Sequence, residues 1–449
     1  MVMIKNFEEL ASSEMRSHAL KMLEAGLISA DPIKSIKNAV RVVGDKLIVK
    51  DKVYDVSSGV KVLGLGKASA TMALAIEDLL GDLITEGAVV VPKGLKPPSL
   101  RRIKVYYGSH PVPDEDSINS TKEILNLRSK DGKETFIVLI SGGGSALFEL
   151  PLEPVTLKDL RELTTQLLRC GADIKEINTV RKHISLVKGG RLAELLYPSN
   201  VISLILSDVV GDPIEFIASG PTAPDPTTYE EASFILKRYG IWESVPPSIR
   251  EVLTRGLRGE IQETPKPGDK IFDKVMNYLV ASNYISLKAM EDEAKNLGYN
   301  TLILTSMMEG EAREVGKFLA GIIKNVKKYD EPVKKPAAIL IGGETTVTVK
   351  GKGIGGRNQE LALSVAISIA GLEDVVFASI GSDGIDGISI AAGGLVDGNT
   401  VIEGKKLGLN PYDFLNSNDS YNYLAKLKSS ILTGPTGTNV NDLVIALIK

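Results

Sequence analysis

The sequence contains little of what several classes of protein require. It has one cysteine, Cys170, so no intramolecular disulfide can form, and only three widely spaced histidines, which argues against a structural zinc site. No apolar run approaches the roughly 18 residues of a membrane span, and the start of the chain lacks the pattern of a secretory signal. Lysine and arginine do not gather with aromatic residues on any segment. We therefore expect a cytoplasmic protein that binds neither membrane nor nucleic acid.

The chain is long enough for two hydrophobic cores. It has 449 residues, 43% of them apolar and 24% charged, with a formal net charge of −3, which are ordinary values for a globular protein. Prolines cluster between Gly220 and Lys270, where no strand is evident. We predict a boundary at Lys270, with an N-terminal domain of residues 1–270 and a C-terminal domain of residues 271–449.

Short apolar runs alternate with helical stretches along both predicted domains. Runs of four to eight residues that are rich in valine and isoleucine and end at Gly, Ser or Asp are typical of buried parallel strands. The expected strands are 60–65, 88–91, 103–107, 136–140, 201–206, 278–281, 301–304, 338–341 and 375–380. This alternation predicts an α/β fold with doubly wound layers.

Two glycine-rich segments follow predicted strands and favour binding of an anion. In KVLGLGKASATMA, Gly64 and Gly66 allow close approach of a ligand, and Lys67 offers a point cation for phosphate. In ISGGGSAL, Ser141, Gly142–Gly144 and Ser145 lead from a strand into a predicted helix, where free N–H groups and the helix dipole attract negative charge. Neither segment is a Walker A loop, and a plain tight turn is the alternative for each.

Acidic residues that close predicted strands are candidate metal ligands or bases. Asp208 follows strand 201–206, and Asp383 and Asp386 lie in a glycine-rich turn after strand 375–380. Asp208 and Asp383 could together hold Mg²⁺, which prefers oxygen ligands. Asp212 and Asp225 precede prolines and are expected to form turns. His110 is likewise expected in a turn, and His183 in the packing of a helix.

Basic residues recur at nearly helical spacing between positions 181 and 191. Two interpretations are open: a cationic face directed at an acidic substrate, or a solvated helix surface. The residues concerned are Arg181, Lys182, Lys188 and Arg191.

The second half contains the densest group of candidates. Gly351, Gly353 and Gly356 spell GxGxxG after an expected strand, TTVTV, which raises a dinucleotide-binding hypothesis. No acid closes the next strand at the required distance, and Arg357 directly after the glycines is better suited to hold phosphate or a carboxylate. One lysine, one arginine, two strand-end acids and a triple-glycine loop are what phosphoryl transfer needs.

Eight segments, in this order, resemble the glycerate kinases of the MOFRL type. They are GLGKASATMA, GSHPVPD, ISGGGSAL, INTVRKHISLVKGGRLA, SDVVGDPIEFIASGPTAPD, GGETTVTVKGKGIGGRNQELAL, GSDGIDG and TGPTGTNVNDL. The resemblance implies a two-domain α/β fold, with a Rossmann-like parallel-sheet N-terminal domain, a smaller mixed α/β C-terminal domain and an active-site cleft between them. It also implies transfer of the γ-phosphate of ATP to D-glycerate with Mg²⁺ or another divalent cation, giving 2-phosphoglycerate.

Carried onto this sequence, the resemblance and the strand-end analysis give one set of predicted site residues. The catalytic residues are Lys67, Asp208, Arg357 and Asp383; the ATP- or phosphate-binding residues are Ser141, Gly142, Gly143, Gly144, Ser145, Asn283 and Glu344; the metal ligands are Asp208 and Asp383. The resemblance also directs Thr436, Asn439 and Asp442 towards the site, with a turn or cap as their alternative role.

Two other functions are kept open at this point. GxGxxG gives local support to an NAD(P)-dependent hydroxypyruvate reductase. A non-enzymatic sensor of a sugar acid that signals by domain closure is the second. A homodimer is also left open.

Overall fold

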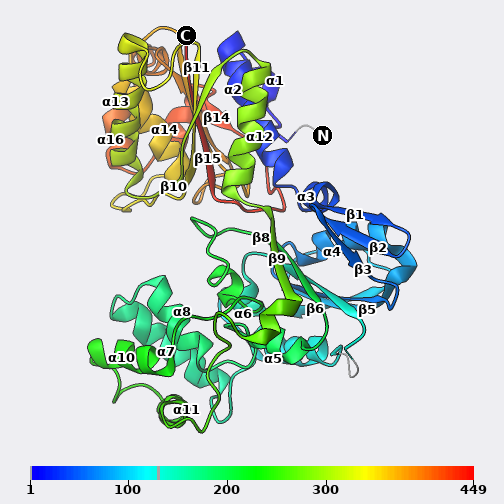
Figure 1. Ribbon diagram of the computed structural model, residues 1–449. Helices are drawn as coiled ribbons and strands as arrows, with labels where there is room; N and C mark the ends of the chain where they lie inside the picture. Colours follow the sequence, from blue (N-terminus) through cyan, green and yellow to red (C-terminus); the bar gives the residue numbers. More distant parts are fainter. Residues whose placement is uncertain (1–2, 129–131) are drawn as a thin grey trace. The chain divides into compact units, whose positions relative to one another are not determined.

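The computed structural model describes residues 3–128 and 132–449 (Figure 1). The chain forms two compact units. The first, here called the parallel-sheet unit, consists of Ser35–Ser207 and Asp212–Val280. The second, the mixed-sheet unit, consists of Met1–Lys34, Asp208–Gly211 and Ala281–Lys449. Within residues 3–128 and 132–449, no helix has both the length and the apolar character that crossing a bilayer requires.

These units differ from the predicted domains of residues 1–270 and 271–449. The first 34 residues belong to the mixed-sheet unit because helix α2 (Glu14–Ser29) buries its apolar face there. Leu20 and Leu23 of α2 share a hydrophobic cluster with Met290 of helix α12 (Asn283–Asn296) and Ile445 of strand β15 (Asp442–Ile448). A partner about 270 residues further along the chain leaves no local signal in the sequence.

The parallel-sheet unit is built on a sheet in the order β6-β5-β4-β7-β8-β9. Its neighbouring pairs from β6 to β8 are parallel, as expected. The strands are β4 (Val60–Leu65), β5 (Ile84–Pro92), β6 (Ile103–Gly108), β7 (Thr135–Ile140), β8 (Val201–Leu206) and β9 (Val275–Ala281). All six residues of β7 and of β8 are buried, which explains why both sequences are continuous apolar runs.

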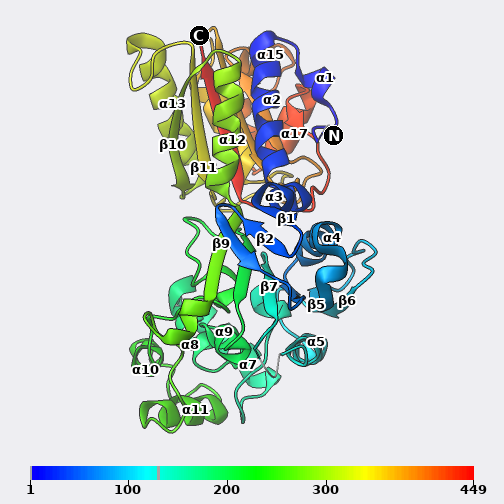
Figure 2. The same ribbon diagram turned by 45° about the vertical axis from the view of Figure 1, so that its right-hand side comes forward.

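Helices surround this sheet, and a small antiparallel sheet that the sequence did not reveal adjoins them. The helices are α3 (Pro32–Ala39), α4 (Ser69–Leu80), η1 (Gly81–Leu83), α5 (Glu115–Leu125), α6 (Gly144–Leu147), α9 (Arg191–Leu196), η2 (Ile217–Ser219) and η3 (Lys270–Lys274), and the small sheet is β1 (Val40–Val43), β2 (Lys46–Val49) and β3 (Lys52–Asp55). Four further helices, α7 (Leu157–Arg169), α8 (Ile174–Lys182), α10 (Tyr229–Arg238) and α11 (Pro247–Leu257), share a separate apolar core and lie together in Figure 2. As predicted, the described tract from Gly220 to Lys270 contains no strand.

The mixed-sheet unit has the strand order β10-β11-β15-β12-β13-β14. The strands before β15 are β10 (Asn300–Met308), β11 (Ala337–Gly343), β12 (Val375–Gly381), β13 (Gly393–Asp397) and β14 (Ser430–Ile431). Helices α13 (Ala312–Tyr329) and α14 (Arg357–Ser368) cover one face, and α2 and α12 cover the other (Figure 1). The remaining helices are α1 (Phe7–Leu10), α15 (Thr400–Lys406), α16 (Pro411–Asn416) and α17 (Ser420–Lys426).

Strand β15 fixes the edge at which the polar residues of this unit gather. It runs antiparallel to both β11 and β12, so that Asp442 lies opposite Gly343 on one side and Gly381 on the other. The carboxyl ends of β11 and β12 therefore meet the start of β15. The expectation that 338–341 and 375–380 are strands is confirmed, but the strand that lies between them is the antiparallel β15.

The predicted strand TTVTV is wrong. Residues 344–356 contain only an isolated bridge at Thr346 and otherwise form a loop that leads into α14. A Cβ atom on Gly351 would overlap the carbonyl oxygen of Ser417, and one on Gly356 would overlap Asp386. These glycines permit close packing inside the protein, so the GxGxxG pattern does not form the strand-to-helix turn of a dinucleotide site.

Candidate active site

The triple-glycine loop and the loop that carries Lys67 are joined at the ends of two neighbouring strands. Because β4 and β7 pair in parallel, Leu65 lies beside Ile140 and the chain leaves both strands at the same edge. The backbone N–H of Lys67 donates to the carbonyl of Gly142 (2.9 Å), and that of Ala68 donates to the Ser141 hydroxyl (3.0 Å). Ser141, which we predicted to bind ATP or phosphate, is buried and fixes the two loops to each other, which argues against direct contact with a ligand.

Lys67 and His110 flank the same glycine, Gly143. A Cβ atom built on Gly143 would lie 2.9 Å from Cδ2 of His110 and 3.3 Å from Cε of Lys67. Lys67 is exposed, and within the described part of the chain its ammonium group has no hydrogen bond or ion pair. Burial lowers the pKa of His110, and the nearby Lys67 charge lowers it further. At neutral pH this cluster therefore has one cation without a counter-charge beside bare backbone, which suits an anionic ligand.

Gly143 provides the first prediction. It has φ = 81°, in the left-handed region, so we expect Gly143→Ala to cost about 1 kcal/mol in folding free energy through backbone strain. We also expect a loss of anion affinity, because the new methyl group would push against Lys67 and His110. Titration with inorganic phosphate or ADP would measure this loss. Gly171→Ala is the control, because Gly171 also has positive φ (79°) but has open space around its Cα atom.

Beneath the glycine loop, a strained turn holds Ser145. The hydroxyl oxygens of Ser145 and Ser219 lie 2.6 Å apart, and Ser219 donates to Oδ1 of Asn178 (2.7 Å). Ala218 and Ser219 have φ values of 51° and 63°, which are unfavourable for residues with a side chain. The turn that these two residues form places the buried Ser219 hydroxyl against Ser145.

The basic residues between positions 181 and 191 form neither of the two expected surfaces. Lys188 is buried and donates to the carbonyls of Ser145 (2.7 Å) and Phe148 (3.1 Å), while its ammonium group lies 3.3 Å from Glu149. Burial lowers the pKa of Lys188 to about 8. Lys182 is also buried and pairs with Asp225 at 3.3 Å. Lys182 and Lys188 are therefore held by internal ion pairs, and Lys188 also supports the carbonyl of Ser145 at the glycine loop. His183, as predicted, is packed inside.

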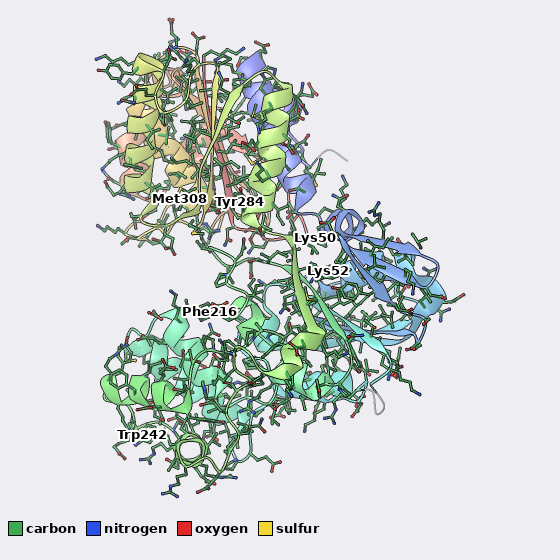
Figure 3. The ribbon with its side chains drawn as sticks, viewed as in Figure 1. Lys50, Lys52, Phe216, Trp242, Tyr284 and Met308 are labelled. Atoms are coloured by element: carbon green, nitrogen blue, oxygen red, sulfur yellow. The ribbon has the colours of Figure 1, made fainter. Side chains whose placement is uncertain are left out.

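In the mixed-sheet unit, the centre of the site is the ion pair between Arg357 and Asp442. Arg357 is the first residue of α14, and its Nε and Nη2 atoms donate to both carboxylate oxygens of Asp442 at 2.8–3.0 Å. Its Nη1 atom lies 2.7 Å from Oε1 of Glu344. We call Arg357, Glu344, Asn358, Asn441 and Asp442 the Arg357 cluster. Met308 and Tyr284, labelled in Figure 3, mark the same sheet edge on β10 and α12.

Burial sets the charge states in the Arg357 cluster. Asp442 is fully buried, and burial raises its pKa to about 6 despite the hydrogen bonds from Arg357 and from Asn358 (2.8 Å). Burial lowers the pKa of Arg357. The hydrogen bonds and the negative charge of Asp442 together have a larger effect, so that the pKa of Arg357 is raised. Asp386 accepts the backbone N–H groups of Asn358 and Gln359 at the start of α14, and burial raises its pKa also. Asp386 thus caps the helix that carries Arg357.

Asn441 connects this cluster to the two acids predicted to bind metal. Its side-chain amide donates to Oε2 of Glu344 (2.9 Å) and to the backbone carbonyl of Asp208 (3.0 Å). Its own carbonyl accepts the N–H of Ser382, the residue before Asp383. Asn441 has φ = 65°, a conformation that Asn tolerates better than most residues. Asp208 and Asp383 therefore lie on segments that one strained asparagine holds together.

Asn283, which we predicted to contact ATP, has a different position. It is buried, and its amide donates to the carbonyls of Val440 (2.8 Å) and Asp442 (2.9 Å). Its oxygen packs against Gly342, where even a Cβ atom would overlap it. Asn283 fixes the start of β15, which argues against direct contact with a ligand.

Sequence patterns indicate three residues of the site weakly or not at all. His110 is predicted only to lie in a turn, Asn441 is not among the predicted residues, and Asp386 is predicted only as part of a glycine-rich turn. The signal available for Asn441 and Asp442 is their position directly before a six-residue apolar run at 443–448, which belongs to strand β15. That run was not recognised as a strand.

Known proteins are similar to this chain along nearly its whole length. Residues 18–254 match a family described as a domain of unknown function (DUF4147), and residues 337–442 match the MOFRL family. The glycerate 2-kinase of Pyrococcus horikoshii is 46% identical over 98% of this chain and 98% of its own length. A protein of Agrobacterium vitis provisionally named hydroxypyruvate reductase is 43% identical over 86% of both chains. The crystal structure of glycerate kinase (EC 2.7.1.31) from Thermotoga maritima aligns with a TM-score of 0.87 at 42% identity, covering 97% of this chain and 99% of that one.

Proposed function

This chain belongs to the family of these glycerate kinases, with both its DUF4147 and its MOFRL segment, and we propose that it transfers the γ-phosphate of ATP to a hydroxyl group of D-glycerate. The observation that carries the proposal is the exposed Lys67 ammonium group beside the bare backbone of Gly143. A cation without a counter-charge, next to a glycine loop at a strand end, is suited to polyphosphate.

The reaction needs charge stabilisation and a proton acceptor. An oxygen of a glycerate hydroxyl forms a bond to the γ-phosphorus while the bond from that phosphorus to the β–γ bridging oxygen breaks, and ADP leaves. The hydroxyl proton passes to a carboxylate, for which Asp208 and Asp383 are our candidates. Lys67 and Arg357 are assigned to the negative charge of the phosphates or of the glycerate carboxylate. The 2-hydroxyl, and hence 2-phosphoglycerate, is our choice of acceptor and product, and the name of the Pyrococcus horikoshii relative, glycerate 2-kinase, supports it.

The donor set at Asp208 and Asp383 fits a divalent cation of the magnesium type. The described residues contain no group of three or more His, Cys, Asp or Glu side chains arranged to hold a metal. Mg²⁺ in kinases, however, is held by one or two carboxylates together with the phosphates of the nucleotide, so two acids are sufficient. When bound, the cation would neutralise phosphate charge.

The two acids provide the second prediction. We expect Asp208→Asn and Asp383→Asn each to lower kcat by about 10²–10⁴-fold, because each removes a metal ligand or the base. Steady-state kinetics over a range of Mg²⁺ concentrations would measure this. Asp374→Asn is the control, since Asp374 immediately precedes β12, at the end of that strand opposite Asp383. Near-normal rates for both site variants would contradict the assignment.

The proposal is tested by a coupled ADP-release assay with ATP, Mg²⁺ and D-glycerate, followed by phosphorus NMR of the product. Glycerate-dependent release of ADP and a resonance of 2-phosphoglycerate are expected.

Absence of turnover, together with NADH oxidation on addition of hydroxypyruvate, would establish the reductase instead. The packed glycines of residues 351–356 count against that alternative. Intact glycerate and ATP after long incubation would favour the sensor. A cytoplasmic location and a homodimer stay predictions from sequence.

A further inference from the structure

A pocket of about 520 Å³ opens beside Arg357 within the mixed-sheet unit. Its walls are the loop between β11 and α14, which includes Val347, Val349 and Gly355, and the turn at Ile388. This volume lies within the range of about 300–1,000 Å³ that is typical of small-molecule sites. The phosphates and the glycerate have charged or polar groups throughout. The apolar walls of this pocket are therefore better suited to another part of a ligand.

Two aliphatic side chains at this pocket are far more exposed than their chemistry favours. Val349 is 73% exposed and Ile388 is 79% exposed, and both line the pocket. Water against these side chains is unfavourable, so an apolar ligand that covered them would gain free energy. The lining also includes the backbone of Gly355 and Gly356.

The pocket walls are held in place before any ligand binds. Oδ1 of Asn418 accepts the backbone N–H groups of Lys350 (2.7 Å) and Gly351 (2.9 Å), which fixes the loop next to Val349. The N–H of Ile388 donates to the carbonyl of Gly355 (3.3 Å), which joins the opposite turn to the glycine segment. Asn418 itself has φ = 54°, an unfavourable conformation that the surrounding hydrogen bonds maintain. Such a preformed pocket loses little entropy on binding.

We propose that this pocket receives the base and ribose of the nucleotide, with its phosphates directed towards Arg357. This inference rests on the proposed kinase function. Glycerate has a carboxylate and two hydroxyls on three carbons, so valine and isoleucine walls would leave its polar groups unpaired. A purine base has a large flat surface and needs the apolar cover that Val349 and Ile388 provide. Arg357 then offers a planar donor to phosphate at the mouth of the same pocket.

The test compares Val349→Asp and Ile388→Asp with Ile390→Asp. Ile390 lies two residues from Ile388 and is 71% exposed, but it does not line the pocket. We expect each pocket variant to raise the KM for ATP and the Kd for ADP by about tenfold or more, because a carboxylate replaces apolar contact. The KM for D-glycerate and all constants of Ile390→Asp should stay within about twofold of the wild type. Inorganic tripolyphosphate, which lacks the nucleoside, should inhibit the wild type and the variants equally.

The outcomes separate this inference from the proposed function. If the wild type phosphorylates glycerate but both pocket variants keep the wild-type KM for ATP, the kinase stands and the pocket assignment is overturned. If the KM for glycerate rises while that for ATP does not, the pocket holds the acceptor and the assignment is also overturned. If the wild type has no kinase activity, calorimetric titration with ADP still tests the pocket, and equal affinity in wild type and variants would refute it.

Discussion

Replacing Lys67 by alanine should lower kcat/KM by about 10²–10³-fold while leaving the fold intact. The size of the effect follows from the loss of one preorganised cation at the phosphates, where electrostatic stabilisation is strongest. The fold should survive because Lys67 is exposed and its ammonium group has no ion pair within residues 3–128 and 132–449. Coupled ADP release would give the kinetic effect, and circular dichroism with a thermal scan would show whether Tm changes.

Two further variants sharpen this experiment. Lys67→Arg keeps the charge but changes the shape, so we expect it to restore part of the activity. Lys52→Ala removes an exposed lysine of β3, labelled in Figure 3, and should behave as the wild type. If Lys67→Ala unfolds, the role of Lys67 is structural. If it has normal kinetics, catalysis does not depend on this cation.

The second large effect is expected from Asp442→Asn. Asp442 accepts three hydrogen bonds from the guanidinium group of Arg357, and the amide of Asn cannot accept them all with the same geometry. We therefore expect kcat to fall about 100-fold, because Arg357 loses its orientation. Glu344→Gln, which changes the more exposed partner of Arg357, should have a smaller effect. Equal losses in the two variants would contradict the central role of Asp442.

The pKa of Asp442 adds a pH dependence with two opposite signs. Burial raises this pKa from 3.8 to about 6, so the folded protein binds the proton more tightly than the unfolded chain does. The contribution of Asp442 to stability therefore becomes more favourable as the pH falls from 7 through 6 towards 4. Activity should change in the opposite direction, because the protonated carboxyl group holds Arg357 less firmly.

The kinetic measurement for this prediction is the profile of kcat against pH between 5 and 8. We expect an acid limb near pH 6 that disappears in Asp442→Asn. The pKa of His110 is lowered from 6.5 and could produce a limb in the same range, so the profile of His110→Asn is needed as well. A limb that persists in Asp442→Asn and vanishes in His110→Asn would assign the titration to His110.

Local patterns in the sequence were sufficient for strands β4–β12 and for the residues that follow them, but they missed β1–β3 and β13–β15. Each of the nine expected runs is part of a strand, because a short apolar run between glycines has few other ways to be buried. Arg357 and Asp383 lie near the same sheet edge because β12 ends before Asp383 and pairs with the strand that begins at Asp442, the partner of Arg357. The rule that ligands bind beyond the carboxyl ends of strands therefore found candidate residues without any knowledge of the strand order.

The rest depended on contacts that sequence spacing does not encode. Lys182 and Lys188 have the spacing of a surface helix, but their partners Asp225 and Glu149 lie 43 and 39 positions away and bury them. His110 approaches Gly143 only because β6 and β7 belong to one sheet. Asn441 and Asp442 acquire their roles from the insertion of β15 between β11 and β12.

The central position of β15 has a consequence for the order in which the chain can fold during synthesis. β15 follows every other strand in the sequence, yet it separates β11 from β12. During synthesis, helices α2 and α12 and five strands of the mixed sheet therefore emerge from the ribosome before β15, the strand that connects them. The parallel sheet, whose six strands are complete at Ala281, can assemble much earlier. We expect the nascent mixed-sheet unit to expose the unpaired edges of β11 and β12 until β15 emerges, which makes this unit prone to aggregation at that stage.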